Sequence, residues 1–207
     1  MDYFNFLYIF DLIGTFAFAM SGALLGIKKS MDIYGMTVLA YATGVGGGTL
    51  RDIMLGRIPP FVFTDINYVI IIFLATLLVF FLNPIISKTK PLMVLNIVDA
   101  IGLGVFTCIG ASISIEYEIG WYGVIFFGVV TATVGGMIRD VLAGEVPFVL
   151  KKEVYASASI IGGIIFLILY KFNVNQEFNI AITASIVTFI RLYTLYKNIN
   201  LPSLKVQ

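Results

Sequence analysis

The sequence predicts an all-α polytopic membrane protein with seven transmembrane helices, arranged as two inverted three-helix repeats plus a seventh helix. Apolar residues make up 59% of the 207 residues and charged residues only 12%, whereas soluble domains have about 45–50% apolar and about 25% charged residues. Apolar stretches of about 20 residues, long enough to span a bilayer, recur along the chain. A pattern also repeats at an offset of 88 residues, as from Asp11 to Asp99.

The expected spans are the seven apolar stretches. They cover residues 4–27, 33–55, 66–82, 92–115, 121–143, 154–170 and 178–196. None of the connections is long or polar enough to form a soluble domain. We therefore expect a single membrane domain over residues 1–207, with repeat one at 4–83, repeat two at 92–171 and the seventh helix at 178–197.

The distribution of basic residues predicts the orientation in the membrane. One side, formed by the first, third and fifth connections and the tail, holds Lys28, Lys29, Lys88, Lys90, Lys151, Lys152, Lys197 and Lys205. The other side holds only Arg57 and Lys171. Because cytoplasmic loops are enriched in lysine and arginine, we expect a multi-pass protein of the plasma membrane with its N-terminus outside and its C-terminus in the cytoplasm.

The repeat is densest around an Arg-Asp pair that follows two glycines. Residues 47–52, Gly-Gly-Thr-Leu-Arg-Asp, match residues 135–140, Gly-Gly-Met-Ile-Arg-Asp. Each repeat contains three spans, an odd number, so the second copy must enter the membrane from the opposite side. Pro59 and Pro147 match as well and are expected to end helices two and five.

The glycine runs predict that helices two and five kink or open, because glycine is about 1 kcal/mol less favourable than alanine in a helix. Carbonyls freed at membrane depth would line an ion path. Close helix packing is the alternative, and it is the interpretation that we prefer for Gly22 and Gly26. The expected pathway residues are Thr43, Gly46, Gly47, Gly48, Arg51, Asp52, Thr131, Gly135, Gly136, Arg139 and Asp140.

Two arginines lie within spans, where a charge is costly and usually functional. From depth, Asp11 should meet Arg51 in the outer half, and Asp99 should meet Arg139 in the inner half, as gating ion pairs. The aspartate after each arginine should point about 100° away from it. A purely structural pair that locks adjacent helices is an equally open reading.

These motifs resemble the prokaryotic branch of the trimeric intracellular cation (TRIC) channels over nearly the whole chain. The resemblance rests on Gly46-Gly47-Gly48 with Arg51-Asp52, and on Gly135-Gly136 with Arg139-Asp140; Val134 stands opposite Gly46. It implies a homotrimer in which each protomer has its own pore between the two kinked helices. It also implies passage of potassium and other monovalent cations.

Membrane lipids are further expected partners. Animal members of the family are similar in having a lysine-rich lipid-binding element, which the run Lys151-Lys152-Glu153-Val154 suggests. A positive-inside loop explains the same lysines without a specific lipid.

Two other functions compete with a channel. The same repeat has been labelled a glycine-transporter domain, and inverted repeats are equally typical of secondary transporters, here for glycine or a similar small zwitterion. A non-conducting structural protein would use the glycines and ion pairs for packing only. We expect no enzyme, cofactor or metal site, because the chain lacks histidine and any nucleophile–base pair. Its net charge of +1 offers no basic face for nucleic acid.

Overall fold

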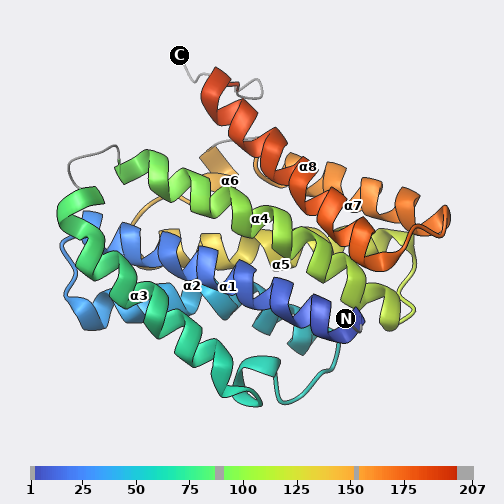
Figure 1. Ribbon diagram of the computed structural model, residues 1–207, viewed down its shortest axis with the longest axis horizontal. Helices are drawn as coiled ribbons and strands as arrows, with labels where there is room; N and C mark the ends of the chain where they lie inside the picture. Colours follow the sequence, from blue (N-terminus) through green and yellow to red (C-terminus); the bar gives the residue numbers. More distant parts are fainter. Residues whose placement is uncertain (1–2, 87–90, 152–153, 200–207) are drawn as a thin grey trace.

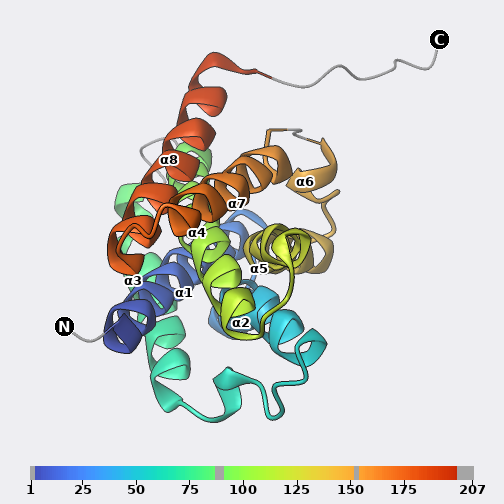
Figure 2. The same cartoon turned by 90° about the vertical axis from the view of Figure 1, so that its right-hand side faces the viewer.

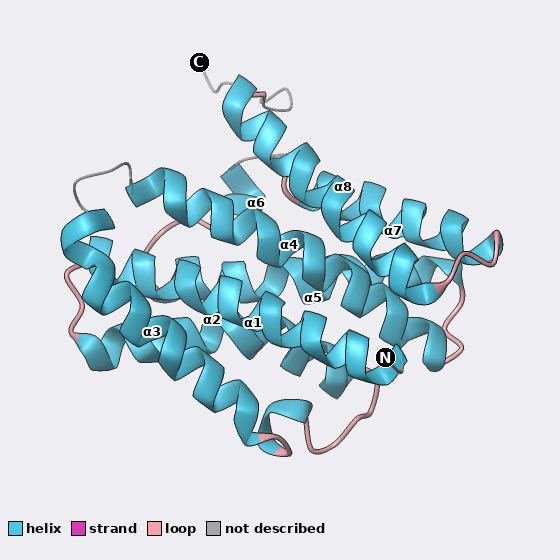
Figure 3. Cartoon of the chain, viewed as in Figure 1, coloured by secondary structure: helices cyan, strands magenta, loops and turns pink. Residues whose placement is uncertain are grey.

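The computed structural model describes residues 3–86, 91–151 and 154–199, and within these ranges every regular element is a helix (Figure 3). The elements are α1 (Tyr3–Lys28), α2 (Ile33–Met54), the 3₁₀ helix η1 (Phe61–Phe63), α3 (Ile66–Ile86), α4 (Pro91–Glu116), α5 (Trp121–Leu142), α6 (Phe148–Lys151), α7 (Ala156–Lys171) and α8 (Gln176–Lys197). The long helices coincide with the expected apolar stretches to within a few residues. The short elements η1 and α6 were not expected.

Local hydrogen bonds and glycine turns fix the ends of α2 and α5. Asp32 caps the start of α2 by accepting a hydrogen bond from the Gly35 amide at 2.8 Å. Gly56 follows α2 with a φ of +74°, and Gly144 follows α5 with a φ of +68°, a conformation that glycine adopts without steric cost. The prolines that were expected to end these helices lie beyond the glycine turns and precede η1 and α6.

Four helices form the centre of the molecule. α1, α2, α4 and α5 pack against one another, α3 lies against α1 and α2, and the α7–α8 pair lies against α4 and α5 (Figures 1 and 2). The equivalent helices α1 and α4 run in opposite directions along the long axis, and so do α2 and α5 (Figure 1). The C-terminal ends of α2 and α5 therefore lie at opposite ends of the molecule, which we name the Arg51 end and the Arg139 end.

Five helices of the described chain are long and apolar enough to cross a membrane. They are α1, α3, α4, α5 and α8. α2 has 22 residues, but its many glycines, threonines and tyrosines make its apolar stretch less hydrophobic than those of the five helices, and α7 has only 16 residues. Five candidate spans support a multi-pass membrane protein, while a membrane crossing by α2 and α7 stays a prediction.

The glycine runs bring α2 and α5 into backbone contact. A Cβ atom on Gly47 would lie 2.1 Å from the Thr131 carbonyl oxygen, and one on Gly135 would lie 2.2 Å from the Thr43 carbonyl oxygen. Because real Cβ atoms do not approach an oxygen so closely, these positions require glycine. The two contacts are equivalent under the repeat, so a pseudo-two-fold relation passes through the α2–α5 contact.

The other helix pairs of each repeat are packed in the same way. A Cβ atom on Gly22 would lie 2.7 Å from the Leu39 carbonyl oxygen, and one on Gly110 would lie 2.3 Å from the Phe127 carbonyl oxygen. Gly26 likewise faces Met36, so the packing role expected for these α1 glycines is confirmed. Helical structure also continues through the glycine runs of α2 and α5. The expected opening of these helices is therefore wrong, while a bend remains a prediction.

Candidate ion pathway

Arg139 is the centre of a buried network at the Arg139 end. Its Nη1 donates to Asp99 Oδ1 at 2.6 Å and to Ser21 Oγ at 2.9 Å, and its Nε donates to Asp140 Oδ1 at 2.9 Å. The guanidinium also lies 5.2 Å from the centre of the Phe148 ring. The network ties α5 to α1 and α4, because its partners come from all three helices. Breaking a buried pair of this kind costs about 3–5 kcal/mol.

Arg51 has fewer partners at the Arg51 end. Its Nε and Nη2 donate to Asp52 Oδ1 at 3.0 and 2.8 Å, and its guanidinium lies 5.6 Å from the centre of the Phe61 ring. Nη1 of Arg51 has no hydrogen-bond partner among the described residues. The side chain is nevertheless only 1% exposed.

The aspartate after each arginine is part of its site. Asp52 accepts a hydrogen bond from the Phe61 amide at 3.0 Å, and Asp140 accepts one from the Phe148 amide at 2.8 Å. The expectation that these aspartates point away from the arginines is wrong. The long arginine side chain folds back over its neighbour, and the loop after the glycine returns an amide to the second carboxylate oxygen.

Only one of the two expected gating pairs is a direct contact. Asp99 pairs with Arg139 as the repeat suggested. Asp11 instead accepts a hydrogen bond from the Tyr68 hydroxyl at 2.8 Å, and no ion pair within 4.0 Å joins Asp11 to Arg51 in the described structure. The competing donor comes from α3, which an argument from depth alone did not consider.

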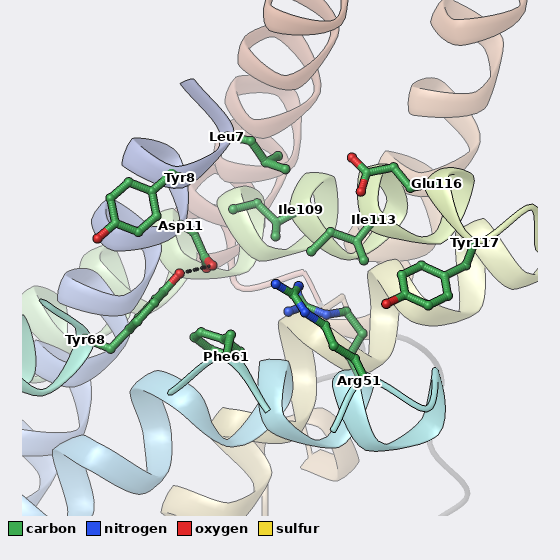
Figure 4. Close-up of a pocket in the computed structure, with 11 residues that line it drawn as sticks. Leu7, Tyr8, Asp11, Arg51, Phe61, Tyr68, Ile109, Ile113, Glu116 and Tyr117 are labelled. Atoms are coloured by element: carbon green, nitrogen blue, oxygen red, sulfur yellow. Dashed lines mark hydrogen bonds between the residues drawn. The ribbon is translucent and has the colours of Figure 1, made fainter. Parts of the chain in front are cut away.

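A cavity of about 380 Å³ lies between Asp11 and Arg51 (Figure 4). We call it the Arg51 pocket. It is lined by Leu7, Tyr8, Asp11, Arg51, Arg57, Phe61, Tyr68, Ile109, Ile113, Glu116 and Tyr117. Figure 4 shows the Arg51 guanidinium pointing into the space, with Asp11 and Tyr68 to one side and Glu116 and Tyr117 to the other.

A smaller cavity of about 210 Å³ lies at the Arg139 end. We call it the Arg191 pocket, and it is lined by Lys28, Leu92, Asn96, Phe148 and Arg191. Three of these residues are the repeat equivalents of residues in the Arg51 pocket. Lys28 corresponds to Glu116, Asn96 to Tyr8 and Phe148 to Phe61. Arg191 comes from α8, which has no counterpart in the repeat, and its guanidinium lies 4.9 Å from the centre of the Tyr155 ring.

The remaining predicted pathway residues lie at helix contacts between the two pockets. Thr43 Oγ1 bonds back to the Leu39 carbonyl at 2.5 Å, while Thr131 Oγ1 is buried without a hydrogen-bond partner in the described structure. The glycines beside them face protein atoms. A Cβ atom on Gly46 would lie 2.8 Å from Ile138, one on Gly48 would lie 2.6 Å from Phe61, and one on Gly136 would lie 3.1 Å from the Tyr155 hydroxyl.

Sequence reasoning missed several contributors to these sites, among them Ser21, Phe61, Tyr68, Phe148 and Arg191. A signal existed for the two phenylalanines, because each follows a proline shortly after the left-handed glycine. Their spacing also shows that the second copy is one residue shorter in this loop, so that Pro60-Phe61 corresponds to Pro147-Phe148. The matching of Pro59 with Pro147 was therefore wrong by one residue. Lys152 and Glu153 of the suggested lipid-binding run lie outside the described residues.

Comparison with known proteins gives consistent matches in sequence to one family model and to two relatives. The family model described as "Glycine transporter" matches twice, at residues 8–84 and 96–171. The UPF0126 inner membrane protein YadS of Escherichia coli K12 is 38% identical over 199 residues, 95% of each chain. A UPF0126 membrane protein of Vibrio cholerae is 45% identical over 162 residues, which are 77% of this chain and 66% of that protein.

Solved structures match over nearly the full length. A TRIC orthologue from Rhodobacter sphaeroides has a TM-score of 0.88 and 34% identity, covering 93% of this chain and 98% of its own. A chain from work on conductance through TRIC cation channels has a TM-score of 0.85 and 36% identity, covering 96% and 97%. A prokaryotic TRIC channel in 0.5 M KCl has a TM-score of 0.89 and 31% identity, covering 96% and 100%.

The fold and the paired Arg-Asp sites therefore define a duplicated, all-helical, multi-pass membrane protein whose structural neighbours are cation channels. The chain belongs to the prokaryotic branch of the TRIC channel family, together with relatives that carry the name UPF0126 membrane proteins.

Proposed function

We propose that this protein is a potassium-permeable channel for monovalent cations, with one pore through each protomer between α2 and α5. Two polar pockets at opposite ends of the α2–α5 contact support this pathway. The TRIC neighbours support cation conduction in general. The pathway follows Thr43, Gly46–Gly48, Arg51 and Asp52 on α2, and Thr131, Gly135, Gly136, Arg139 and Asp140 on α5.

The observation that carries the proposal is the number of carboxylates that surround each arginine. Arg51 stands with Asp52 and Asp11, and Arg139 stands with Asp140 and Asp99. In their ionised forms, these groups, two carboxylates and one guanidinium, carry one net negative charge at each arginine. At the Arg51 end, Arg57 and Glu116 add one charge of each sign and keep this balance, so a cation is attracted there although the site contains an arginine. At the Arg139 end, Lys28 and Arg191 line the neighbouring pocket and oppose the attraction. Because the helices are unbroken, these carboxylates rather than freed carbonyls supply the cation sites.

The Arg139 network is the proposed closed gate. It joins α1, α4 and α5 through Ser21, Asp99 and Arg139 with contacts of 2.6 to 2.9 Å. At the other end Asp11 is held by Tyr68, and a cavity separates it from Arg51. Opening would release Asp99 from Arg139 and enlarge the Arg191 pocket. The glycine contacts between α2 and α5 would let the two helices slide or bend against each other.

Assembly and orientation complete the proposal. We propose a homotrimer, by analogy with the trimeric neighbour from Rhodobacter sphaeroides. We propose inverted repeats across the cell membrane, with α2 and α7 as crossings inside the assembly. The lysines of the Arg139 end favour a cytoplasmic position for that end. The Arg51 pocket then faces the outside, and membrane lipids surround the trimer.

Planar-bilayer recording tests the function. Purified protein under a potassium chloride gradient should give unitary currents that reverse near the potassium equilibrium potential. Reversal near the chloride potential, or silence from a protein shown to be folded and trimeric, contradicts the proposal. Bilayers treated with protein-free detergent are the control.

A secondary transporter for glycine or a similar zwitterion is the second candidate. It is favoured by the unpartnered Nη1 of Arg51, which faces a cavity that also contains carboxylates. Counterflow of labelled glycine into proteoliposomes decides between the two. Saturable exchange without unitary currents would establish transport, whereas currents without exchange would establish the channel.

A further inference from the structure

The Arg51 pocket holds a hydrogen-bond donor that no described residue satisfies. Nη1 of Arg51 is unpartnered, while the side chain is 1% exposed and its guanidinium points into the cavity (Figure 4). An unsatisfied donor of this kind costs about 1–3 kcal/mol, and more when it is charged. A metal cation cannot satisfy it, because a donor needs an acceptor. The pocket therefore calls for water or for a ligand that carries an oxygen anion.

The charges around the cavity favour a zwitterion over a simple anion. Arg51 and Arg57 supply positive charge, and the Arg57 side chain is 46% exposed at the mouth. Asp11 and Glu116 supply carboxylates at the same cavity. Together with Asp52, the three carboxylates exceed the two guanidiniums, so a bare anion would enter a negative site. A molecule with both a carboxylate and an ammonium group matches both sets of charges.

The rest of the wall is aliphatic and aromatic. Leu7, Ile109 and Ile113 line the cavity, and each is at most 9% exposed. A volume of about 380 Å³ corresponds to about a dozen waters at their liquid volume of about 30 Å³ each. It also falls within the range of about 300–1,000 Å³ that is typical of small-molecule sites. Free glycine as a ligand would fill only a fraction of this space and would leave the apolar wall exposed to water.

We propose that the Arg51 pocket binds an α-amino acid with an aliphatic side chain and that the bound ligand blocks the pore. The carboxylate binds Arg51 and Arg57, the ammonium group binds on the side of Asp11 and Glu116, and the side chain lies on Leu7, Ile109 and Ile113. Binding itself stands on the pocket alone. The block rests on the proposed channel function, because the pocket is one end of that pathway.

Equilibrium binding of radiolabelled leucine to the purified full-length protein tests the site. Leucine should bind at least about ten-fold more tightly than 4-methylpentanoate, which lacks the ammonium group, or 3-methylbutylamine, which lacks the carboxylate, since each loses charged hydrogen bonds. Glycine should also bind more weakly. Equal binding of 4-methylpentanoate would reassign the pocket to anions, and equal binding of glycine would overturn the aliphatic subsite. No saturable binding of leucine would mean that water alone fills the pocket.

Variants at the mouth locate the binding without disturbing the buried pair. Arg57→Gln and Glu116→Gln should each weaken leucine binding about ten-fold. Glu118→Gln is the matched control, because Glu118 is an exposed acid near Glu116 that does not line the pocket. Unchanged binding in both mouth variants would overturn the assignment of the two charges.

Planar-bilayer recording distinguishes the proposed leucine site from the proposed channel function. Leucine added on the Arg51 side of a bilayer should reduce the potassium current, and Glu116→Gln should require more leucine for the same fractional block. Binding by a protein that carries no cation current would contradict the channel but leave the site intact. A cation current without leucine binding would contradict the site but leave the channel intact.

Discussion

The Arg51 end and the Arg139 end carry the same Arg-Asp motif in different states. At the Arg139 end the upstream aspartate, Asp99, bonds directly to the arginine at 2.6 Å. At the Arg51 end its equivalent, Asp11, bonds to Tyr68, and a cavity of about 380 Å³ lies beside the arginine. One motif can therefore either tie three helices together or face a pocket, depending on which donor the upstream aspartate takes.

The choice of donor coincides with a contact from α8, a helix that has no counterpart in the repeat. Tyr155 follows Tyr68 by 87 residues, the offset that also relates Phe61 to Phe148. Its hydroxyl lies near Asp99, as that of Tyr68 lies near Asp11. The Tyr155 ring lies 4.9 Å from the guanidinium of Arg191, which is contributed by α8. Among the described residues, no arginine stacks on the Tyr68 ring in the same way. The seventh long helix therefore breaks the two-fold relation close to Asp99, the upstream aspartate of the Arg139 end.

Neutralising each arginine gives the largest predicted difference between the ends. Arg139→Gln leaves Asp99 and Asp140 buried without their cation and should cost about 3–5 kcal/mol. Arg51→Gln should cost less, because Asp11 keeps Tyr68 and faces the pocket. Survival of the proposed trimer on size-exclusion chromatography after heating measures both.

A second substitution that restores stability to the Arg139→Gln variant is the control for this prediction. Adding Asp99→Asn removes one of the stranded carboxylates and should recover part of the lost stability. Equal losses in the two single variants would show that the ends do not differ energetically. Loss of the proposed trimer with no change in the open probability of any remaining channel current would favour a structural role for the pair.

The glycine contacts should be equally intolerant in both halves. Gly47→Ala and Gly135→Ala place a Cβ atom 2.1 and 2.2 Å from a carbonyl oxygen, and overpacking of this kind typically costs about 1–3 kcal/mol. Gly120→Ala is the matched control, because its nearest neighbour would lie at 3.5 Å. Thermal unfolding should show similar losses for Gly47 and Gly135 and little change for Gly120. A loss of stability at only one of the two positions would show that the two glycine contacts are not equivalent in energy.

Removal of the Tyr68 hydroxyl and removal of the Ser21 hydroxyl should shift the open probability in opposite directions. Tyr68→Phe removes the donor that holds Asp11, which frees Asp11 to approach Arg51 and should lower the open probability. Ser21→Ala removes an acceptor from Arg139, which loosens the closed network and should raise the open probability. Each change costs about 1–3 kcal/mol at most. Single-channel recording of both variants checks the signs, and shifts in the same direction would argue against donor exchange.

Hydrophobic patterning was sufficient to predict the long helices, but not the partners of the charged residues. The Asp99–Arg139 pair followed from depth because both residues lie on central helices that must touch. The same argument failed for Asp11, because Tyr68 reaches it from α3, where the repeat is weak. Arg191 gave no signal as a site residue, since it lies near the end of the last helix and looks like one more residue of the positive side. Side-chain competition of this kind depends on packing between helices, which periodicity does not encode.

The smallest predicted effect concerns the charges at the two mouths. Glu116 lines the Arg51 pocket, whereas Lys28 and Arg191 line the Arg191 pocket, so cations should enter more readily from the Arg51 end. Glu116→Gln and Lys28→Gln should both straighten a rectifying current–voltage curve, by about two-fold or less. The effect should fade near 1 M salt, where the Debye length falls to about 3 Å. Lys197→Gln is the control, because it removes a lysine from the end of α8 that does not line the pocket. Rectification that is unchanged in low salt would show that these mouth charges do not lie on the path of the ion.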